Sequence, residues 1–424
     1  MRTQKESYKV LIINPFPIDA DCPIGIMMSN LFEEFESNRI LQYYTHECKI
    51  ELQSKFKSRR IDIRPTFARE FHRTVRSLLR KEASRGLSDS DSELRNTGAR
   101  HSSWQVWLDL IVPSELKRDM FDEIHNFRPD VIYTQVYSYS LLKLVIKISN
   151  IFLCPIVVHT LDDWMGSNNK EDIVSWIPDF YFNKMFKKVL NNGEKHMVAS
   201  PKMKCYMERK YGGKYSFVMN CSKFIEIGTT PRETSPLKLV YTGGLMLERF
   251  QVLDEVATIL KSVNRIKAKY EMHVFAPDAH IRCYQERMQD NIIFHNGVKH
   301  CEVSSVLRSA DVLMHVESFN PNVVKFTKYS LSTKIPEYLS SAKPVIYYGP
   351  KSVGVAEFLA GEKIGICTDS SHELEECLVQ LYDDRERRIA LGEEGCTTGK
   401  RLFDKGTMQA TLSNILQGRG ESVL

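Results

Sequence analysis

The sequence predicts an α/β protein with two Rossmann-like, doubly wound domains that face a central cleft. Three observations lead to this prediction. Short apolar, β-branched runs alternate with helical patterns, this alternation occurs twice along the 424 residues, and a polar stretch with two prolines separates the two series. A chain of this length can bury two separate cores, so two domains are the natural expectation.

The first half contains four apolar runs with the length and composition of buried parallel strands. They are residues 9–14, 130–135, 154–159 and 196–200. Between them, Ser114 is the expected N-cap of a helix after Pro113, and Ser200 followed by Pro201 predicts the start of another helix. Together these elements predict an N-terminal domain over residues 1–220.

The second half repeats the pattern with six runs, at residues 238–243, 271–276, 291–296, 311–316, 343–348 and 363–368. We predict a C-terminal domain over 237–400 and a linker over 221–236, and we expect 401–424 to form a helix that returns to the first domain. The stretch 86–103 is rich in Ser, Gly, Asp and Asn, and it predicts a loop or lid inside the first domain.

Composition narrows the class of protein. The chain is 42% hydrophobic and 26% charged, and its net charge of +5 is too small to indicate a nucleic-acid partner. The ten cysteines form no CxxC pair, so neither a zinc site nor a disulfide framework is predicted. The first residues lack a signal-peptide core, and Lys143 and Lys147 interrupt the most apolar later run, so we expect a cytoplasmic protein without a membrane span.

Three segments of the second half carry a family resemblance. They are YTGGLMLERFQVL (241–253), the strand and loop at 291–319, and STKIPEYLSSAKPVIYYGP (332–350). In order and spacing they resemble a retaining glycosyltransferase of family 4, whose architecture is called GT-B. The resemblance implies transfer of a sugar from a nucleotide-diphosphate sugar to a saccharide or lipid-linked saccharide with retention, as in surface polysaccharide biosynthesis.

The third segment predicts a helix that begins beside the end of a strand. Thr333 or Ser332 is the expected cap, and Pro336 falls in the first turn. In doubly wound sheets, ligands bind outside the carboxyl ends of the strands, where helix N-termini favour phosphate. Glu337 lies in this turn, and a carboxylate can accept two hydrogen bonds from a vicinal diol, so we predict that it binds the donor ribose. The other interpretation of Glu337 is a contact with the helix dipole or a surface carboxylate.

The family motif has two glutamates eight positions apart, and this chain departs from it. The partner position holds Tyr329, and residues 320–331 resemble an insertion. Whether Glu317 replaces the missing glutamate is left open by the sequence.

The resemblance also implies a basic residue for the donor diphosphate, after the glycine turn of the second domain. Gly243 and Gly244 allow close approach of the backbone, Arg249 follows them, and Lys334 is a second candidate. The two cations could instead be solvated surface residues. Neither first strand is followed by GxGxxG, which argues against NAD. The DSDSE run has the DxD spelling of a metal site but lies in the polar loop, so we expect no cofactor and no metal.

Two features of the first domain are candidate contacts for the sugar. Gly25 begins a helix after the first strand, where it either lets backbone approach a ligand or simply forms a turn. His159, Asp162 and Asp163 cluster at the end of a buried strand, and the resemblance places a histidine or aspartate of this region near the reaction centre. Each of the three could instead cap the next turn.

Three basic segments, 55–60, 71–85 and 180–190, combine cations with apolar residues at helical spacing. This pattern is typical of a surface that rests on anionic lipid, and equally of helices packed on their own sheet. The first interpretation predicts peripheral contact with the cytoplasmic face of a membrane and a lipid-linked acceptor.

Two other functions remain open. A nucleotide-sugar 2-epimerase has the same two-domain layout but needs acid and base groups around the sugar. A non-catalytic sugar-nucleotide-binding protein would fit the missing glutamate. Nucleic-acid binding is disfavoured because base-stacking aromatic residues are not interleaved with the basic runs.

Overall fold

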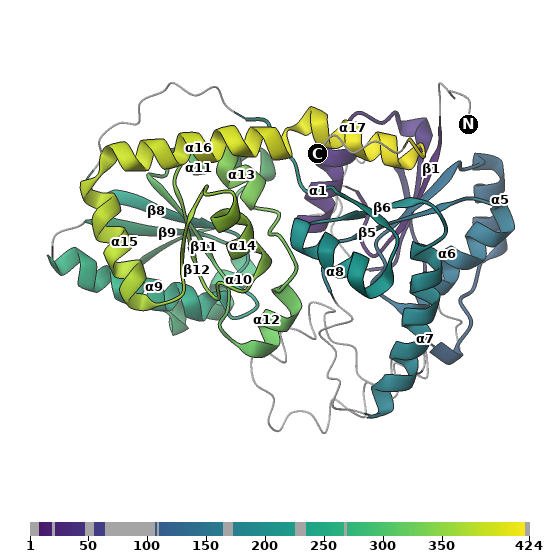
Figure 1. Cartoon of the computed structure of the whole chain (residues 1–424), viewed down its shortest axis with the longest axis horizontal. Coiled ribbons are helices and arrows are strands. Elements are labelled where there is room, and N and C mark those ends of the chain that lie inside the picture. Colours follow the sequence, from purple (N-terminus) through teal and green to yellow (C-terminus); the bar gives the residue numbers. More distant parts are fainter. Residues whose placement is uncertain are drawn as a thin grey trace. The chain divides into compact units, whose positions relative to one another are not determined.

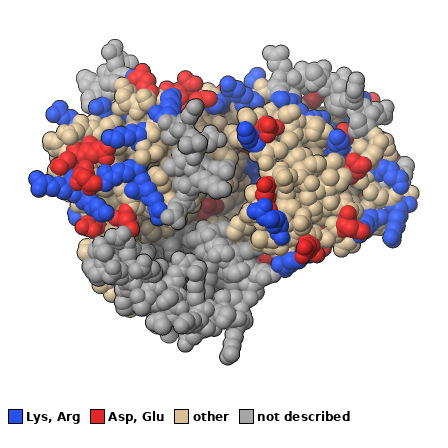
Figure 2. Space-filling model, turned by 180° about the vertical axis from the view of Figure 1, so that it is seen from behind, with Lys and Arg blue, Asp and Glu red and all other residues tan. Residues whose placement is uncertain are grey.

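A computed structural model of the chain describes residues 8–18, 22–46, 55–63, 107, 110–163, 173–224, 235–266 and 269–419, with the backbone alone for 173–176 (Figure 1). The described residues form two compact units. The first contains those up to Met219 together with those from Gly406 onward, and the second runs from Asn220 to Lys405. On the face drawn in Figure 2, Lys and Arg are interspersed with Asp and Glu.

The first unit contains a seven-stranded parallel sheet with the order β3-β2-β1-β4-β5-β6-β7. The strands are β1 (Val10–Asn14), β2 (Ile40–Tyr44), β3 (Lys57–Arg60), β4 (Val131–Thr134), β5 (Ile156–Thr160), β6 (Lys195–Val198) and β7 (Lys214–Phe217). All residues of β1, β2 and β4 are buried, as expected of strands covered on both faces. The strand order reverses between β1 and β4, which makes that position the switch point of the sheet.

Helices flank this sheet (Figure 1). They are α1 (Pro23–Phe32), η1 (Ser37–Arg39), α5 (Arg118–Phe127), α6 (Tyr139–Phe152), α7 (Ile173–Leu190), α8 (Pro201–Tyr211) and α17 (Lys405–Leu416). The predicted start of α8 is confirmed, since Ser200 Oγ accepts a hydrogen bond from Met203 N at 2.8 Å. The predicted cap at Ser114 is wrong: α5 begins only at Arg118, because Ser114 Oγ donates to Ser140 O at 2.6 Å instead.

The second unit contains a six-stranded parallel sheet with the order β10-β9-β8-β11-β12-β13. The strands are β8 (Leu237–Thr242), β9 (Tyr270–Phe275), β10 (Ile292–His295), β11 (Val312–Val316), β12 (Val345–Tyr348) and β13 (Ile366–Thr368). Its helices are α9 (Arg249–Ile266), α10 (Asp278–Tyr284), η2 (Gln285–Arg287), α11 (His300–Ser309), α12 (Pro321–Thr327), α13 (Ile335–Ser340), α14 (Gly354–Gly361), α15 (Ser371–Asp383) and α16 (Arg385–Phe403). Here the switch point lies between β8 and β11.

The two doubly wound domains predicted from the sequence are therefore confirmed. Every predicted strand is present, and the sequence missed β2, β3 and β7. The basic segment 55–60 is not a helix, because its last four residues pair with β2 as the edge strand β3. There Lys57 pairs with Glu123 at 2.5 Å and Arg59 pairs with Asp119. Segments 71–85 and 86–103 lie outside the described residues.

Within the described ranges, the chain has no helix with the length and apolar composition that a bilayer span requires.

Candidate functional site

The switch point of the second sheet gathers the polar residues that follow β8 and β11. The turn after β8 has unusual backbone geometry, with positive φ at Gly243 (129°), Leu247 (59°) and Glu248 (58°). The Glu248 carboxylate holds this turn against the end of β11, because it accepts hydrogen bonds from Ser318 Oγ at 2.7 Å and Asn320 Nδ2 at 3.0 Å. The turn thereby delivers Arg249 as the first residue of α9.

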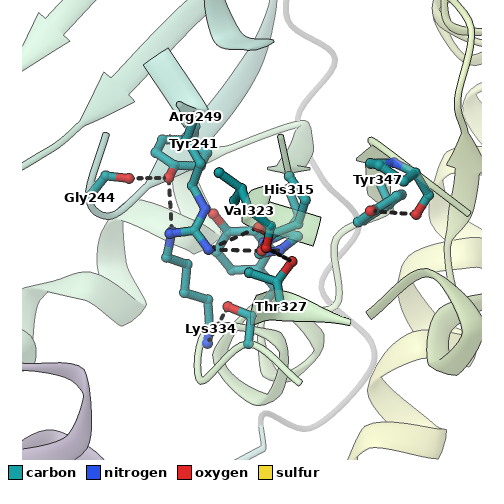
Figure 3. A network of polar contacts seen from close by, with 12 residues as sticks. Tyr241, Gly244, Arg249, His315, Val323, Thr327, Lys334 and Tyr347 are labelled. Atoms are coloured by element: carbon teal, nitrogen blue, oxygen red, sulfur yellow. Dashed lines mark hydrogen bonds and ion pairs between the residues drawn. The ribbon is translucent and has the colours of Figure 1, made fainter. Parts of the chain in front are cut away.

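Arg249 forms a buried ion pair with Glu317 (Figure 3). Its Nη2 donates to both carboxylate oxygens, at 2.9 and 3.1 Å. Burial alone would raise the pKa of Glu317, but Arg249 and His315 more than offset burial and lower that pKa to about 2. His315 Nε2 lies 3.1 Å from Glu317 Oε1, and burial lowers the pKa of His315, so a neutral imidazole donates from Nε2. The Glu317 carboxylate is thus bound to Arg249 and His315. A role for Glu317 in place of the missing glutamate of the family motif stays a prediction.

Lys334 lies against the glycine turn. Its Nζ donates to the Tyr241 hydroxyl at 3.0 Å and lies 4.4 Å from the centre of the Tyr241 ring (Figure 3). A Cβ added to Gly243 would lie 2.2 Å from this nitrogen, so a larger residue would displace the lysine. The Tyr241 hydroxyl in turn donates to Gly244 O at 2.6 Å.

Lys334 is a buried cation next to a second cation. Burial, and then repulsion by Arg249, lower the pKa of Lys334 to about 7. Within the described part of the chain no carboxylate forms an ion pair with this ammonium, whereas Arg249 is bound to Glu317. Lys334 and Arg249 therefore meet beside a glycine turn with the carboxylates of Glu317 and Glu337 nearby, and Lys334, which forms no ion pair among the described residues, is suited to a bound anion.

Glu337 lies in the first turn of α13. Its Oε1 accepts from Asn220 Nδ2 at 3.4 Å and lies 3.8 Å from His300 Nδ1. Burial raises the pKa of Glu337 to about 7, against the opposing effects of Asn220 and Lys334. The helix is fastened to β8 by Tyr338, whose hydroxyl accepts from Thr242 N at 3.0 Å.

The start of α13 differs from the prediction in one respect. The N-cap is Lys334 and has no side-chain capping bond, so the expected cap at Ser332 or Thr333 is wrong. Ser332 instead closes a preceding turn, with its carbonyl accepting from Ile335 N at 3.1 Å. Pro336 lies in the first turn as predicted.

In the first unit, His159, Asp162 and Asp163 meet at one small pocket at the end of β5. The pocket has a volume of about 20 Å³, which is room for about one water molecule. It is lined by Val136, Tyr137, His159, Thr160, Leu161, Asp162, Asp163, Phe186, Met207 and Tyr211. The Tyr137 hydroxyl donates to Asp162 Oδ2 at 3.1 Å. Gly25 is not among the lining residues; it is buried near the start of α1, where its N donates to Cys22 Sγ at 3.4 Å.

Both ring nitrogens of His159 are used inside the fold. Nδ1 accepts from the Tyr133 hydroxyl at 2.7 Å, and Nε2 donates to Val218 O at 2.9 Å. Burial lowers the pKa of His159 to about 4, so the ring is neutral with the proton on Nε2. This geometry fixes the ring as a structural element, and a direct catalytic role for it stays a prediction.

Sequence reasoning missed Tyr241, His315 and Asn220. A signal for His315 was present, because it precedes Glu317 by two residues, and side chains two apart in a strand share a face. Tyr241 likewise precedes the predicted Gly243 by two residues. Asn220 carries no such signal, since it lies far from Glu337 in the sequence.

Comparisons with known proteins identify solved structures that share this fold. No family model matches the sequence, and no curated protein matches it. Sucrose-phosphate synthase from Thermosynechococcus elongatus matches with a TM-score of 0.62 at 12% identity, over 96% of this chain and 98% of that chain. Anabaena HepE in complex with UDP matches with 0.60 at 12% identity, over 96% and 99%. Trehalose 6-phosphate synthase from Burkholderia multivorans matches with 0.54 at 11% identity, over 97% and 98%.

These neighbours are GT-B glycosyltransferases, and the two Rossmann-like units of this chain match them over nearly their whole length. The predicted GT-B fold class is confirmed. Because the identities are low, the likeness establishes the fold, and function has to be argued from the site.

Proposed function

We propose that this chain is a retaining glycosyltransferase of family 4 that moves a sugar from a nucleotide-diphosphate sugar to a saccharide or lipid-linked saccharide. The observation that carries the proposal is the pair of cations, Lys334 and Arg249, beside the Gly243 turn at the switch point of the second sheet. An ammonium without a carboxylate partner is costly to bury, and a diphosphate would compensate it.

In this proposal the donor diphosphate lies against the glycine turn. Lys334 Nζ, which has a single hydrogen-bond acceptor among the described residues, donates to phosphate oxygens. Arg249 is oriented by Glu317 through Nη2, and we assign its guanidinium to the same anion. As the sugar departs, negative charge grows on the nucleoside diphosphate, and fixed cations at this position stabilise it.

Glu337 is the proposed ribose ligand. Its side chain is 18% exposed, and Asn220 contacts one oxygen, so the remaining lone pairs can accept hydrogen bonds from the ribose hydroxyls. A diol that donates to the carboxylate favours its ionised form, which offsets the effect of burial on the pKa.

The first unit would supply contacts to the transferred sugar or the acceptor hydroxyl. We assign these contacts to Asp162 and Asp163, with Tyr137 orienting Asp162. His159 would hold the strand end in place, and Gly25 would permit backbone approach near the start of α1. No metal or cofactor is part of this proposal, because the two cations of the second unit supply the charge that a divalent cation would otherwise provide.

One structural neighbour suggests which donor sugar to test first. HepE was solved with UDP-glucose, in a structure that matches this chain with a TM-score of 0.58 at 13% identity. We therefore propose a nucleoside-diphosphate hexose as the donor, a role in surface polysaccharide synthesis, and a cytoplasmic location.

The test is a two-step assay. A panel of nucleotide sugars, starting with UDP-glucose, is screened for thermal stabilisation, and the best donor is then supplied in labelled form with saccharide acceptors. We expect stabilisation that Lys334→Met reduces and Lys261→Met preserves, because Lys261 lies on α9 and pairs with Asp290. We also expect label in the acceptor with the anomeric configuration of the donor. Donor binding without transfer to any acceptor, or epimerisation of the donor sugar, would contradict the proposal.

A further inference from the structure

One edge of the first sheet holds a strong excess of positive charge. Residues 177–214 contain nine Lys and Arg against three Asp and Glu, a net charge of +6, whereas the whole chain carries only +5. The segment builds most of α7, all of β6 and α8, and the first residue of β7, and these elements follow one another at that edge. The cations are Lys184, Lys187, Lys188, Lys195, Lys202, Lys204, Arg209, Lys210 and Lys214.

Helix α7 presents an apolar stripe to solvent at its N-terminal half. Ile177, Phe180 and Tyr181 are 39%, 52% and 50% exposed, and their spacing puts them on one face of the helix. The same face continues into Lys184 and Lys188, which are exposed as well. The opposite face packs in the core through residues that include Phe182, Phe186 and Leu190. The outward face thus combines large apolar side chains with cations, as in helices that lie at a membrane interface.

Helices α7 and α8 form one continuous surface. The Tyr211 hydroxyl of α8 donates to Asn183 Oδ1 of α7 at 2.8 Å, and the rings of Tyr211 and Phe186 are 5.3 Å apart. Lys210 lies on this surface over the Tyr206 and Tyr211 rings, at 5.0 and 4.9 Å. The cations of α7 and α8 therefore belong to a common edge.

The cations of the neighbouring strands belong to the same edge. Burial is the main cause that lowers the pKa of Lys195, and the nearby charges of Lys204 and Lys214 lower it further. Lys195 of β6, Lys204 of α8 and Lys214 of β7 therefore lie close together. Of the three acids in the segment, Asp179 accepts from the Tyr139 hydroxyl of α6 at 3.3 Å, and Glu194 and Glu208 remain at this edge. Positive charge dominates the surface even so.

We propose that the edge formed by α7 and α8 docks on an anionic lipid bilayer. Ile177, Phe180 and Tyr181 would enter the interfacial region, while the lysines contact anionic headgroups. Charge complementarity favours a polyanionic surface, and the apolar stripe favours lipid over nucleic acid, which would leave that stripe in water. The inference goes beyond the proposed transfer reaction and does not rest on it.

The experiment is co-sedimentation of the full-length chain with vesicles of phosphatidylcholine alone, or with 40 mol% phosphatidylglycerol as a chosen composition. We expect binding only to the anionic vesicles, weakened by salt. Lys184→Glu, Lys187→Glu and Lys188→Glu combined should reduce binding by roughly tenfold or more, and Phe180→Ser with Tyr181→Ser should reduce it severalfold.

A matched control separates the effect of the α7 surface from the effect of net charge. Lys325→Glu, Lys328→Glu and Lys400→Glu combined change the charge equally at three exposed lysines of the second unit and should preserve vesicle binding. Thermal unfolding checks that each variant is folded. Equal binding to both vesicle types, or vesicle binding unchanged in either α7 variant, overturns the proposal. So does binding to a generic RNA that needs the lysines, without binding to vesicles.

Discussion

Donor binding should exchange protons with opposite sign on the two sides of pH 7. In the free chain, burial and the nearby Arg249 lower the pKa of Lys334 to about 7, while burial raises the pKa of Glu337 to about 7. A bound diphosphate favours the charged lysine, so Lys334 takes up a proton. A bound ribose diol favours the ionised carboxylate, so Glu337 releases one.

The magnitude follows from these two values. At pH 8 the free Lys334 is about one-tenth protonated and can take up ~0.9 proton, whereas Glu337 is already mostly ionised and releases only ~0.1. At pH 6 the two contributions reverse. We therefore expect a net uptake of ~0.8 proton at pH 8, a net release of ~0.8 proton at pH 6, and almost none at pH 7.

The assay is isothermal titration of UDP-glucose in buffers that differ in ionisation enthalpy, at the three pH values. A nucleotide sugar is preferred over free UDP because its diphosphate has no terminal oxygen that titrates in this range. Lys334→Met should remove the uptake at pH 8 and leave the release at pH 6, and Glu337→Gln should do the reverse. Binding without proton exchange at both extremes, or with the same sign at both, would refute the reasoning.

Three further predictions concern single residues. Arg249→Met leaves Glu317 buried without its cation and should lower the free energy of unfolding by ~3–5 kcal/mol in urea titrations, whereas Arg249→Met with Glu317→Met should recover much of the loss; wild-type stability of the single variant would contradict the buried ion pair. Gly243→Ala should displace Lys334 and weaken donor binding by roughly tenfold or more in the same calorimetric titration, and an unchanged affinity would show that the lysine does not hold the donor. Asp162→Asn should slow transfer by a factor of ten or more while donor affinity stays the same, measured by initial rates and calorimetry; unchanged rates would remove Asp162 from the reaction.

Lys334 also links function to stability. Its pKa in the folded chain is below the ordinary value of 10.5, so between about pH 7 and 10.5 the unfolded chain binds more protons than the folded chain. Its contribution to stability therefore rises with pH across that window and is least favourable below it. A ligand-binding lysine that is costly to the free protein is what a preformed anion site requires.

The central strands β11 and β12 of the second unit were predictable because all their residues are buried and they form continuous apolar runs in the sequence. The strand β3 was not, because Lys57–Arg60 is a short edge strand without an apolar residue, and its exposed cations resemble a helical basic segment. What holds this strand is pairing with β2 and ion pairs to α5, and neither leaves a local pattern.

The candidate site was predictable only in part. Gly243, Arg249, Lys334 and Glu337 follow strand ends or open helices, and the switch-point rule brings such residues together. The pairing of Arg249 with Glu317 depends on the turn that ends at Glu248, where Leu247 and Glu248 have positive φ. The residue types of that turn do not predict this backbone geometry. For the same reason, the bond from His159 to a backbone carbonyl could not be read from sequence spacing.

The central claim is that the second unit holds a nucleoside diphosphate at the switch point of its sheet. A crystal structure of the chain with bound UDP-glucose tests this most directly. We expect diphosphate oxygens within hydrogen-bonding distance of Lys334 Nζ and Arg249, and ribose hydroxyls within hydrogen-bonding distance of Glu337. A nucleotide bound elsewhere, with Lys334 still on Tyr241 and no phosphate beside Gly243, would contradict it.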